Sequence, residues 1–239
     1  GFSGLYLPEF RDYFRRIPDL LRRMNTIIVH SKMNRDYVFC KQLGIPCEVI
    51  PNGIDLNEFV KFVIPGFRER HGIPGDRPMV LHVSNRKRHD LVFETAKLLP
   101  DMTFIVISNG EEQNPNIENV KLLSWLHRAE VVSAFFSADI SVLTSDYETF
   151  PLVILESMAA GVPWVSRRCG NVEELPGGIV VDAKDNIPDH LADSILLLLQ
   201  NSDFREQKSR DGISAIFQDY NWGKILPQYK RILCPRSAC

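Results

Sequence analysis

Residues 146–163 read DYETFPLVILESMAAGVP, and the rest of the chain is best interpreted outward from them. The apolar run 139–144 before it predicts a buried strand, and the residues from Pro151 to Gly161 predict a helix with proline in its first turn and glycine at its end. A strand, a loop and the beginning of a helix therefore meet here. Because first-turn amides have no intrahelical partners and carry the positive end of the helix dipole, this corner attracts an anion such as a phosphate.

Two glutamates accompany the beginning of this helix. Glu148 precedes the helix, and Glu156 lies about two turns into it. The two carboxylates can therefore face one cleft at different depths, where one meets a sugar and the other a ribose. The alternative interpretation is an ordinary strand–helix unit whose glutamates are solvated.

The composition is typical of a soluble globular protein. The 239 residues are 44% hydrophobic and 24% charged, and a net charge of -2 provides no electrostatic case for binding nucleic acid. Apolar stretches such as 195–199 fall well short of the roughly 20 residues that cross a bilayer. The five cysteines are odd in number and lack paired CxxC spacing, which predicts neither a disulfide framework nor a zinc site and indicates a cytoplasmic protein.

Residues 1–25 are rich in arginine and aromatic side chains, and their spacing predicts two short amphipathic helical pieces broken at Pro18. The favoured interpretation is a solvated basic face. The alternative is a peripheral anchor to anionic lipid at the inner face of a membrane.

Strands and helices alternate along the chain. We expect strands at 26–29, 48–50, 79–83, 103–107, 120–123, 139–144, 164–166 and 178–181. We expect helices between 31 and 44 and at 89–99, 127–137, 151–161, 188–200, 203–217 and 222–233. This alternation predicts an α/β fold with a doubly wound parallel sheet of Rossmann-like type, whose ligands lie at the carboxyl ends of the strands.

A run of basic side chains follows the predicted strand 79–83. Arg86, Lys87, Arg88 and His89 are consecutive, and they lie where a doubly wound sheet binds its ligand. Guanidinium and ammonium groups at that edge suit a diphosphate. The alternative interpretation is a solvated charge run.

The glutamate pair and its surroundings resemble a known family. Glu148 and Glu156, separated by seven residues and followed by MAAGVP at 158–163, resemble the Glu-x7-Glu signature of the group 1 (family 4) retaining glycosyltransferases of GT-B fold. Four other motifs resemble the family in the same order along the chain. They are the Pro-Asn-Gly turn at 51–55, Lys87 with the helix after it, the turn at 169–173, which has lost one glycine, and the tryptophan-containing helix start at 221–224.

This resemblance implies a division of the chain into three parts. Residues 1–58 are expected to be a remnant of an N-terminal Rossmann-like domain with its hinge. Residues 59–221 are expected to form the nucleotide-sugar-binding domain, and 222–239 a helix that packs back toward the N-terminal part.

The resemblance also implies roles for individual residues. Glu148 is the expected catalytic residue, which binds donor-sugar hydroxyls and stabilises an oxocarbenium-like transition state, while Glu156 binds the ribose. Arg86 and Lys87, with a contribution from Arg88, are expected to neutralise the departing nucleoside diphosphate. No metal and no cofactor besides the nucleotide-diphosphate sugar itself are expected.

Further donor contacts are implied on both sides of the site. The backbone amides of Thr149, Phe150 and Leu152 are available to the donor. Trp125 and Leu126 follow the strand that borders the nucleobase pocket in the family, and Trp125 could stack on a base. The alternative for Trp125 is a buried or hydrophobic-patch tryptophan.

Two functions remain open on the sequence alone. The first is a retaining glycosyltransferase of polysaccharide or glycoconjugate biosynthesis, which moves a sugar from a nucleotide-sugar to a glycan, a lipid-linked acceptor or another hydroxyl. The second is a truncated or inactive nucleotide-sugar-binding module, because nothing in the chain matches the acceptor-side glycine loop or the N-domain histidine of the family. An epimerase of the same broad fold is a distant third and is disfavoured by the Glu-x7-Glu string.

Overall fold

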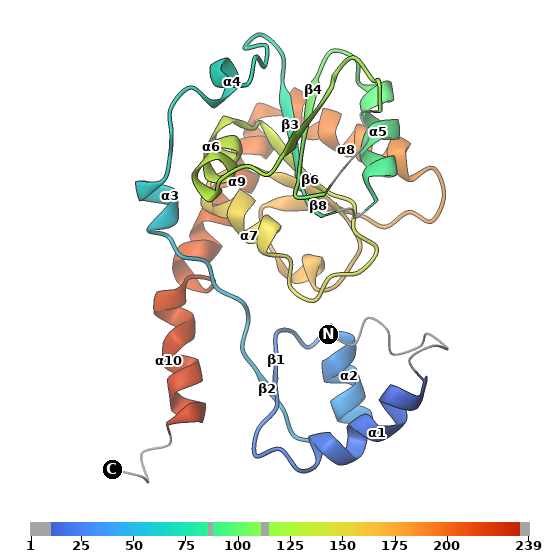
Figure 1. Ribbon diagram of the computed structural model, residues 1–239, viewed down its shortest axis with the longest axis vertical. Helices are drawn as coiled ribbons and strands as arrows, with labels where there is room; N and C mark the ends of the chain where they lie inside the picture. Colours follow the sequence, from blue (N-terminus) through green and yellow to red (C-terminus); the bar gives the residue numbers. More distant parts are fainter. Residues whose placement is uncertain (1–10, 86–87, 111–114, 235–239) are drawn as a thin grey trace.

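Six parallel strands form the main sheet of the protein. In the computed structural model, which describes residues 11–85, 88–110 and 115–234, they are ordered β5-β4-β3-β6-β7-β8 (Figure 1). The strands are β3 (Met79–Val83), β4 (Thr103–Ser108), β5 (Val120–Ser124), β6 (Ile140–Leu143), β7 (Trp164–Arg167) and β8 (Gly178–Val181). The expected doubly wound α/β fold is confirmed.

The strand order reverses between β3 and β6. From β3 the chain moves outward to β4 and β5, and it then returns to add β6, β7 and β8 on the other side of β3. Val80 pairs with Ile140, and Leu81 pairs with Ser141, so the two central strands lie directly side by side. In open α/β sheets, ligands bind outside the carboxyl ends of the strands at such a reversal.

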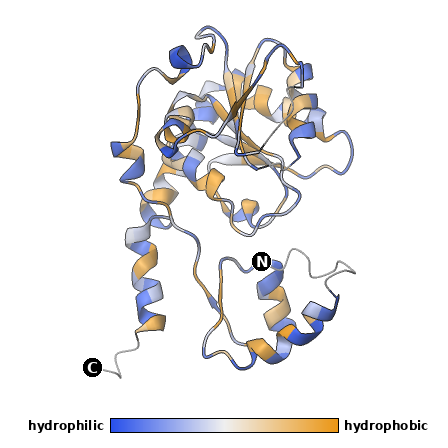
Figure 2. Cartoon of the chain, in the orientation of Figure 1, coloured by the Kyte–Doolittle hydropathy of each residue, from blue (hydrophilic) through white to orange (hydrophobic). Residues whose placement is uncertain are grey.

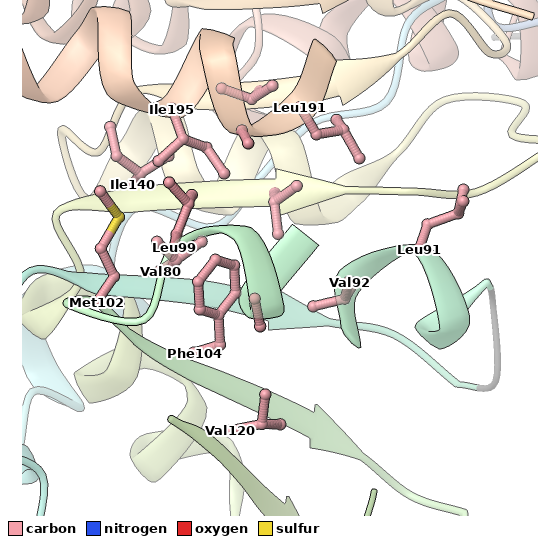
Figure 3. Close-up of a cluster of buried hydrophobic side chains, with 14 of the residues drawn as sticks. Val80, Leu91, Val92, Leu99, Met102, Phe104, Val120, Ile140, Leu191 and Ile195 are labelled. Atoms are coloured by element: carbon pink, nitrogen blue, oxygen red, sulfur yellow. The ribbon is translucent and has the colours of Figure 1, made fainter. Parts of the chain in front are cut away.

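One face of this sheet is covered by α5 (His89–Leu98) and α8 (Ile187–Gln200). Alternate strand residues, such as Val80, Phe104 and Ile140, point to this side and pack against Leu91 of α5 and Leu191 of α8 (Figure 3). Side chains alternate across a strand, so their neighbours Leu81 and Ile105 belong to the core on the opposite face.

The opposite face is covered by four helices. They are α4 (Phe67–Arg70), α6 (Arg128–Ser137), α7 (Leu152–Ala159) and α9 (Ser202–Gln218). Phe67 and Phe135 pack on β3 and β4, whereas Ile154, Trp164 and Ile216 form a second cluster around α7. With both faces covered, the strands are predominantly hydrophobic, as Figure 2 shows.

Helix α7 begins and ends where its sequence predicts. Pro151 occupies the N-cap position, where the missing amide hydrogen costs no intrahelical bond. Gly161, with φ of 72°, follows the C-cap residue Ala160 and turns the chain toward β7. The helix start is thereby held at the carboxyl end of β6.

A smaller unit precedes the main sheet. It contains α1 (Arg11–Leu21), the parallel pair β1 (Ile28–Val29) and β2 (Glu48–Val49), and α2 (Arg35–Gln42) between these strands. The expected break at Pro18 is wrong, because α1 is one helix that continues through this residue. Phe14 and Ile17 are buried on one side of α1, and the ring of Phe14 contacts Phe39 of α2, so packing holds the helix together despite the lost backbone bond.

None of the helices in the described part of the chain combines the length and the apolar character needed to cross a membrane. Contact of α1 with a lipid surface stays a prediction.

A linker and the last helix connect the two units. The linker contains α3 (Glu58–Lys61), and α10 (Trp222–Leu233) runs beside it away from the main sheet (Figure 1). The amide of Ile54 donates to the carbonyl of Tyr220 at 2.8 Å, and the amide of Trp222 donates back to Ile54 at 3.2 Å. A Cβ on Gly53 would lie 3.1 Å from the Ile225 side chain, so the linker and α10 are closely packed. The domain limits at 58 and 221 stay predictions.

Candidate functional site

The loops that follow β3 and β6 meet at the reversal of the sheet. The hydroxyl of Thr144, just after β6, donates to the carbonyl of Arg88 at 3.1 Å. Arg88, which precedes α5, adopts a left-handed backbone with φ of 54°. Its Nη1 atom lies 3.0 Å from Oδ1 of Asp146 in the loop after β6. Two segments far apart in the sequence thus form one corner of the site.

Arg88 is held by two carboxylates. Its Nε donates to Oδ1 of Asp90 at 3.0 Å and its Nη2 donates to Oδ2 at 2.9 Å, in addition to the contact with Asp146. The hydrogen bonds from Arg88 lower the pKa of the Asp90 carboxyl below its ordinary value. A diphosphate at Arg88 would therefore share this guanidinium with Asp90 and Asp146. The neighbouring candidates Arg86 and Lys87 lie outside the described residues.

Two buried histidines, His82 and His89, lie next to this corner and connect β3, β6 and the start of α5 by hydrogen bonds. Nδ1–H of His82, in β3, donates to the carbonyl of Val142, in β6, at 2.9 Å. The other ring nitrogen of His82 therefore accepts from the hydroxyl of Ser84 at 2.8 Å, and Ser84 in turn accepts from Nε2–H of His89 at 3.1 Å. Complete burial lowers the pKa of His82 to about 4, and this ring is neutral at ordinary pH.

Glu148 lines a pocket of about 310 Å³ between the two units. The walls come from 33–36 of the smaller unit, from 146–149 after β6, and from 168–170 with Glu173 after β7. Glu148 and Thr149 are both half-buried in this wall. The pocket therefore opens at the carboxyl ends of β6 and β7, on the same edge of the sheet as Arg88.

Gly170 sets the position of the Glu148 backbone. It has φ of 54°, and a Cβ at this residue would lie 2.5 Å from the carbonyl oxygen of Glu148. No side chain fits there without moving the loop. Of the two glycines in the turn that resembles the family, this chain has kept the one that contacts Glu148.

The smaller unit contributes side chains to this pocket. The guanidinium of Arg35, at the start of α2, lies 5.0 Å from the ring centroid of Tyr147, within cation–π range. The hydroxyl of Ser31 donates to Glu174 at 2.5 Å, in the short helix η3 (Val172–Glu174). The first contact fastens the N-terminal segment to the loop that carries Glu148, and the second fastens it to η3 after β7.

Glu156 lies deeper than Glu148 and has a cationic partner. Its side chain is 14% exposed, and its Oε1 lies 2.6 Å from Nη1 of Arg128, the first residue of α6. Burial raises the pKa of the Glu156 carboxyl, and the positive charge of Arg128 opposes this effect. The sequence analysis missed Arg128 because the residue shares no motif with Glu156.

Arg167 is a second cation that the sequence analysis missed. It ends β7, and its Nη1 contacts Oδ1 of Asp146, the carboxylate that also binds Arg88. Arg168 follows and lies 2.5 Å from Glu173 and 3.0 Å from Asp182. A pair of arginines at the carboxyl end of a predicted strand is a signal that could have drawn attention to this side of the pocket.

Trp125 and Leu126 differ in their surroundings. Trp125 has φ of 58° and is 71% exposed, so the buried alternative for this tryptophan is wrong. The left-handed turn after β5 directs the chain away from the sheet and leaves the indole in solvent. Leu126 packs against the hydrophobic cluster that contains Phe67 and Phe135. Stacking of a base on Trp125 stays a prediction.

Phe150 and Leu152 flank the start of α7. Phe150 is buried, its ring contacts His30 and Tyr220, and its carbonyl accepts from Asn52 at 3.3 Å. The side chain of Phe150 thus joins the smaller unit to the main unit, and it is buried away from a donor. The side chain of Leu152 is exposed.

The part of the chain that the structure describes contains no group of three or more His, Cys, Asp or Glu side chains arranged to hold a metal ion.

Comparisons with known proteins agree with this fold. The sequence model of the family described as "Glycosyl transferases group 1" matches residues 78–201. N-acetyl-alpha-D-glucosaminyl L-malate synthase of Bacillus anthracis is 24% identical over 225 residues, which cover 87% of this chain and 58% of that protein.

Solved structures show the same architecture. Sucrose-phosphate synthase of Thermosynechococcus elongatus superposes with a TM-score of 0.80 at 20% identity over 97% of this chain and 62% of its own. Anabaena Alr3699/HepE, solved in complex with UDP-glucose, gives a TM-score of 0.79 at 20% identity over 97% of this chain and 70% of its own.

The fold is thus that of the GT-B glycosyltransferases, with the doubly wound sheet of their C-terminal domain. The match of the family model to residues 78–201 shows that the chain belongs to the group 1 glycosyltransferases. It spans 58% of the length of the curated relative from Bacillus anthracis.

Proposed function

We propose that this chain is the donor-binding part of a retaining glycosyltransferase. It binds a nucleoside diphosphate sugar and presents the sugar for transfer to a hydroxyl group of a glycan, a lipid-linked acceptor or another acceptor. The observation that carries this proposal is the placement of Glu148 and Glu156 on one strand–helix unit, with Glu148 in an open pocket and Glu156 deeper, beside the β3/β6 reversal. The complex of Alr3699/HepE with UDP-glucose supports a nucleotide-sugar donor for a chain of this fold.

Each candidate residue has a physical role in this proposal. Glu148 accepts hydrogen bonds from sugar hydroxyls and stabilises the positive charge that develops on the sugar ring in the transition state. Arg86 and Lys87, with Arg88, neutralise the departing diphosphate. Glu156 accepts hydrogen bonds from the ribose hydroxyls.

The remaining contacts are to the diphosphate and the base. The backbone amides of Thr149, Phe150 and Leu152 surround the positive end of α7 and face the phosphates. Trp125 and Leu126 border the base, and the exposed indole of Trp125 offers a stacking surface. The diphosphate charge is balanced by side chains in this scheme, so no metal takes part.

The domain organisation belongs to the same proposal. Residues 1–58 represent the end of an N-terminal domain with its hinge, 59–221 the donor-binding domain, and 222–239 the helix that returns toward the N-terminal part. The contacts of Ile54 with Tyr220 and Trp222 support this return, because they bring the hinge and the start of α10 together.

The test is titration calorimetry of the 239-residue chain with UDP, GDP and UDP-glucose. Binding of at least one nucleotide in wild type, weakened by Glu156→Ala and unaffected by Glu206→Ala, is the expected result. Glu206 is a matched control because it is an exposed glutamate on α9 that pairs with Arg210. Failure of wild type to bind any of the three ligands would refute the proposal for these nucleotides.

A binding module without transfer activity is the second candidate. The observation that favours it is the length of the chain, which spans 58% of its relative from Bacillus anthracis. Both candidates predict nucleotide binding, and release of nucleoside diphosphate in the presence of an acceptor separates them.

A further inference from the structure

The guanidinium of Arg128 lies between two carboxylates from different parts of the chain. Its Nη1 is 2.6 Å from Oε1 of Glu156 in α7. Its Nε donates to Oε2 of Glu58 at 2.8 Å, and its Nη2 lies 2.8 Å from the same oxygen. Glu58 begins α3 on the linker, so one side chain of α6 connects the linker to the deeper glutamate of the site.

The contact with Arg128 compensates for the unfavourable burial of the Glu156 carboxylate. A carboxylate that is 14% exposed loses most of its hydration, and this loss disfavours its charged form. The planar guanidinium offers several donors at fixed angles and can bind two carboxylates at once, which a lysine cannot do as well. The ring of Phe59 lies 5.9 Å from the guanidinium carbon and limits its movement.

We propose that Arg128 is the positioning residue of the donor site: it orients the Glu156 carboxylate through Oε1, and through Glu58 it fastens that carboxylate to the linker. This inference rests on the proposed function, in which Glu156 accepts hydrogen bonds from the ribose. Arg128 contacts Glu156 through Oε1, which leaves Oε2 as the oxygen that would accept from the ribose hydroxyls. The two carboxylates and one guanidinium together keep one negative charge, so Glu156 remains a strong acceptor.

The pH dependence of binding provides a test that a purely structural role would not affect. A ribose hydroxyl needs the ionised carboxylate, so binding is strong above the pKa of Glu156 and is lost as the pH falls through it. In the described residues, the charged groups that face Glu156 are Arg128 of α6, which lowers this pKa, and Glu58 of α3, which raises it. Removal of Arg128 must therefore shift the pH midpoint of binding upward, and removal of Glu58 must shift it downward.

The experiment is calorimetry of the full chain with UDP and GDP at a series of pH values on both sides of the midpoint of binding. In Arg128→Met the midpoint moves to higher pH, and affinity near neutral pH falls roughly tenfold or more, because the buried carboxylate has lost its partner. In Glu58→Gln the midpoint moves to lower pH. Arg128→Lys keeps the charge without the planar fork, and its midpoint stays close to that of wild type.

Glu206→Gln is the control and leaves the profile unchanged. Circular dichroism establishes that each variant is folded. If Arg128→Met does not fold, the shift of Glu58→Gln to lower pH, against an Arg128→Lys midpoint close to that of wild type, decides the matter. Wild type that binds neither nucleotide would refute the proposed function. Wild type that binds, with Glu58→Gln and any folded Arg128→Met giving the wild-type pH midpoint, would overturn the positioning role alone.

Discussion

Gly170 is the residue on which the position of Glu148 depends most directly. Its φ of 54° disfavours side chains, and a Cβ would collide with the Glu148 carbonyl. We expect Gly170→Ala to lower the free energy of unfolding by about 1–3 kcal/mol, through backbone strain and displacement of the loop. The same change should weaken binding of UDP-glucose more than binding of UDP, because Glu148 is the residue that we propose to contact the sugar.

Gly44→Ala is the matched control for Gly170→Ala. Gly44 has φ of 64°, and no atom lies within 4 Å of the Cβ that alanine would add. It therefore undergoes the backbone strain without the collision. Urea denaturation and calorimetry of both variants measure the difference. Equal effects of the two substitutions on sugar-nucleotide binding would contradict the role assigned to Gly170.

Glu156 provides a second prediction at the residue scale. Glu156→Ala should weaken nucleoside diphosphate binding by about 1–3 kcal/mol, the range for loss of charged hydrogen bonds to hydroxyls. Arg128 keeps its partner Glu58 in this variant, so the loss should come from the ligand rather than from unfolding. Calorimetry with UDP and GDP measures it, and unchanged affinity for every nucleotide that binds wild type would exclude the ribose role.

At the scale of elements, β3 and β6 are joined by the buried ring of His82. Burial lowers the pKa of His82 from 6.5 to about 4. Between these two pH values the unfolded chain binds a proton at this residue and the folded protein does not. Stability should therefore fall as the pH decreases from about 6.5 toward about 4, by on the order of 3 kcal/mol in total. Stability above this window should not depend on His82 protonation.

His82→Gln tests this dependence. The variant should be less stable than wild type near neutral pH, because the ring fills its space well, but its stability should fall less steeply with acidity. Urea denaturation at about pH 7 and about pH 5 measures the two slopes. His190→Gln, an exposed histidine of α8, serves as the control and should keep the wild-type slope. If the free energy of unfolding of His82→Gln falls with acidity as steeply as that of wild type, the pH dependence comes from other groups.

At the scale of the whole molecule, donor binding and sugar transfer should separate. The proposed donor-side residues lie on the six-stranded unit, whereas the smaller unit, as far as the structure describes it, provides one strand pair and two helices. Transfer in enzymes of two domains depends on closure over the reactants, which orients the acceptor and excludes water. We therefore expect measurable nucleotide affinity with negligible transfer from this chain, measured as nucleoside diphosphate released in the presence of acceptors. Rapid transfer by the chain alone would show that the smaller unit already completes the acceptor side.

The order and type of the main elements follow from local patterns in the chain. Apolar runs bounded by Gly and Pro located β3 through β8 to within one or two residues, because a parallel sheet covered on both faces requires such runs. The same local pattern located the start of α7 and the two glutamates that flank it. At Pro18 local reasoning was wrong, since burial of Phe14 and Ile17 outweighed the lost hydrogen bond.

The pairing of charged side chains, in contrast, depends on how distant elements pack together. Glu58 and Arg128 are 70 residues apart in sequence, and neither belongs to a motif that includes Glu156. Likewise, Asp146 joins Arg88 to Arg167 across two strand ends. Such pairs depend on how the helices pack on the sheet. A local pattern reports which face of an element is apolar, but it does not report the distance between polar atoms on different elements.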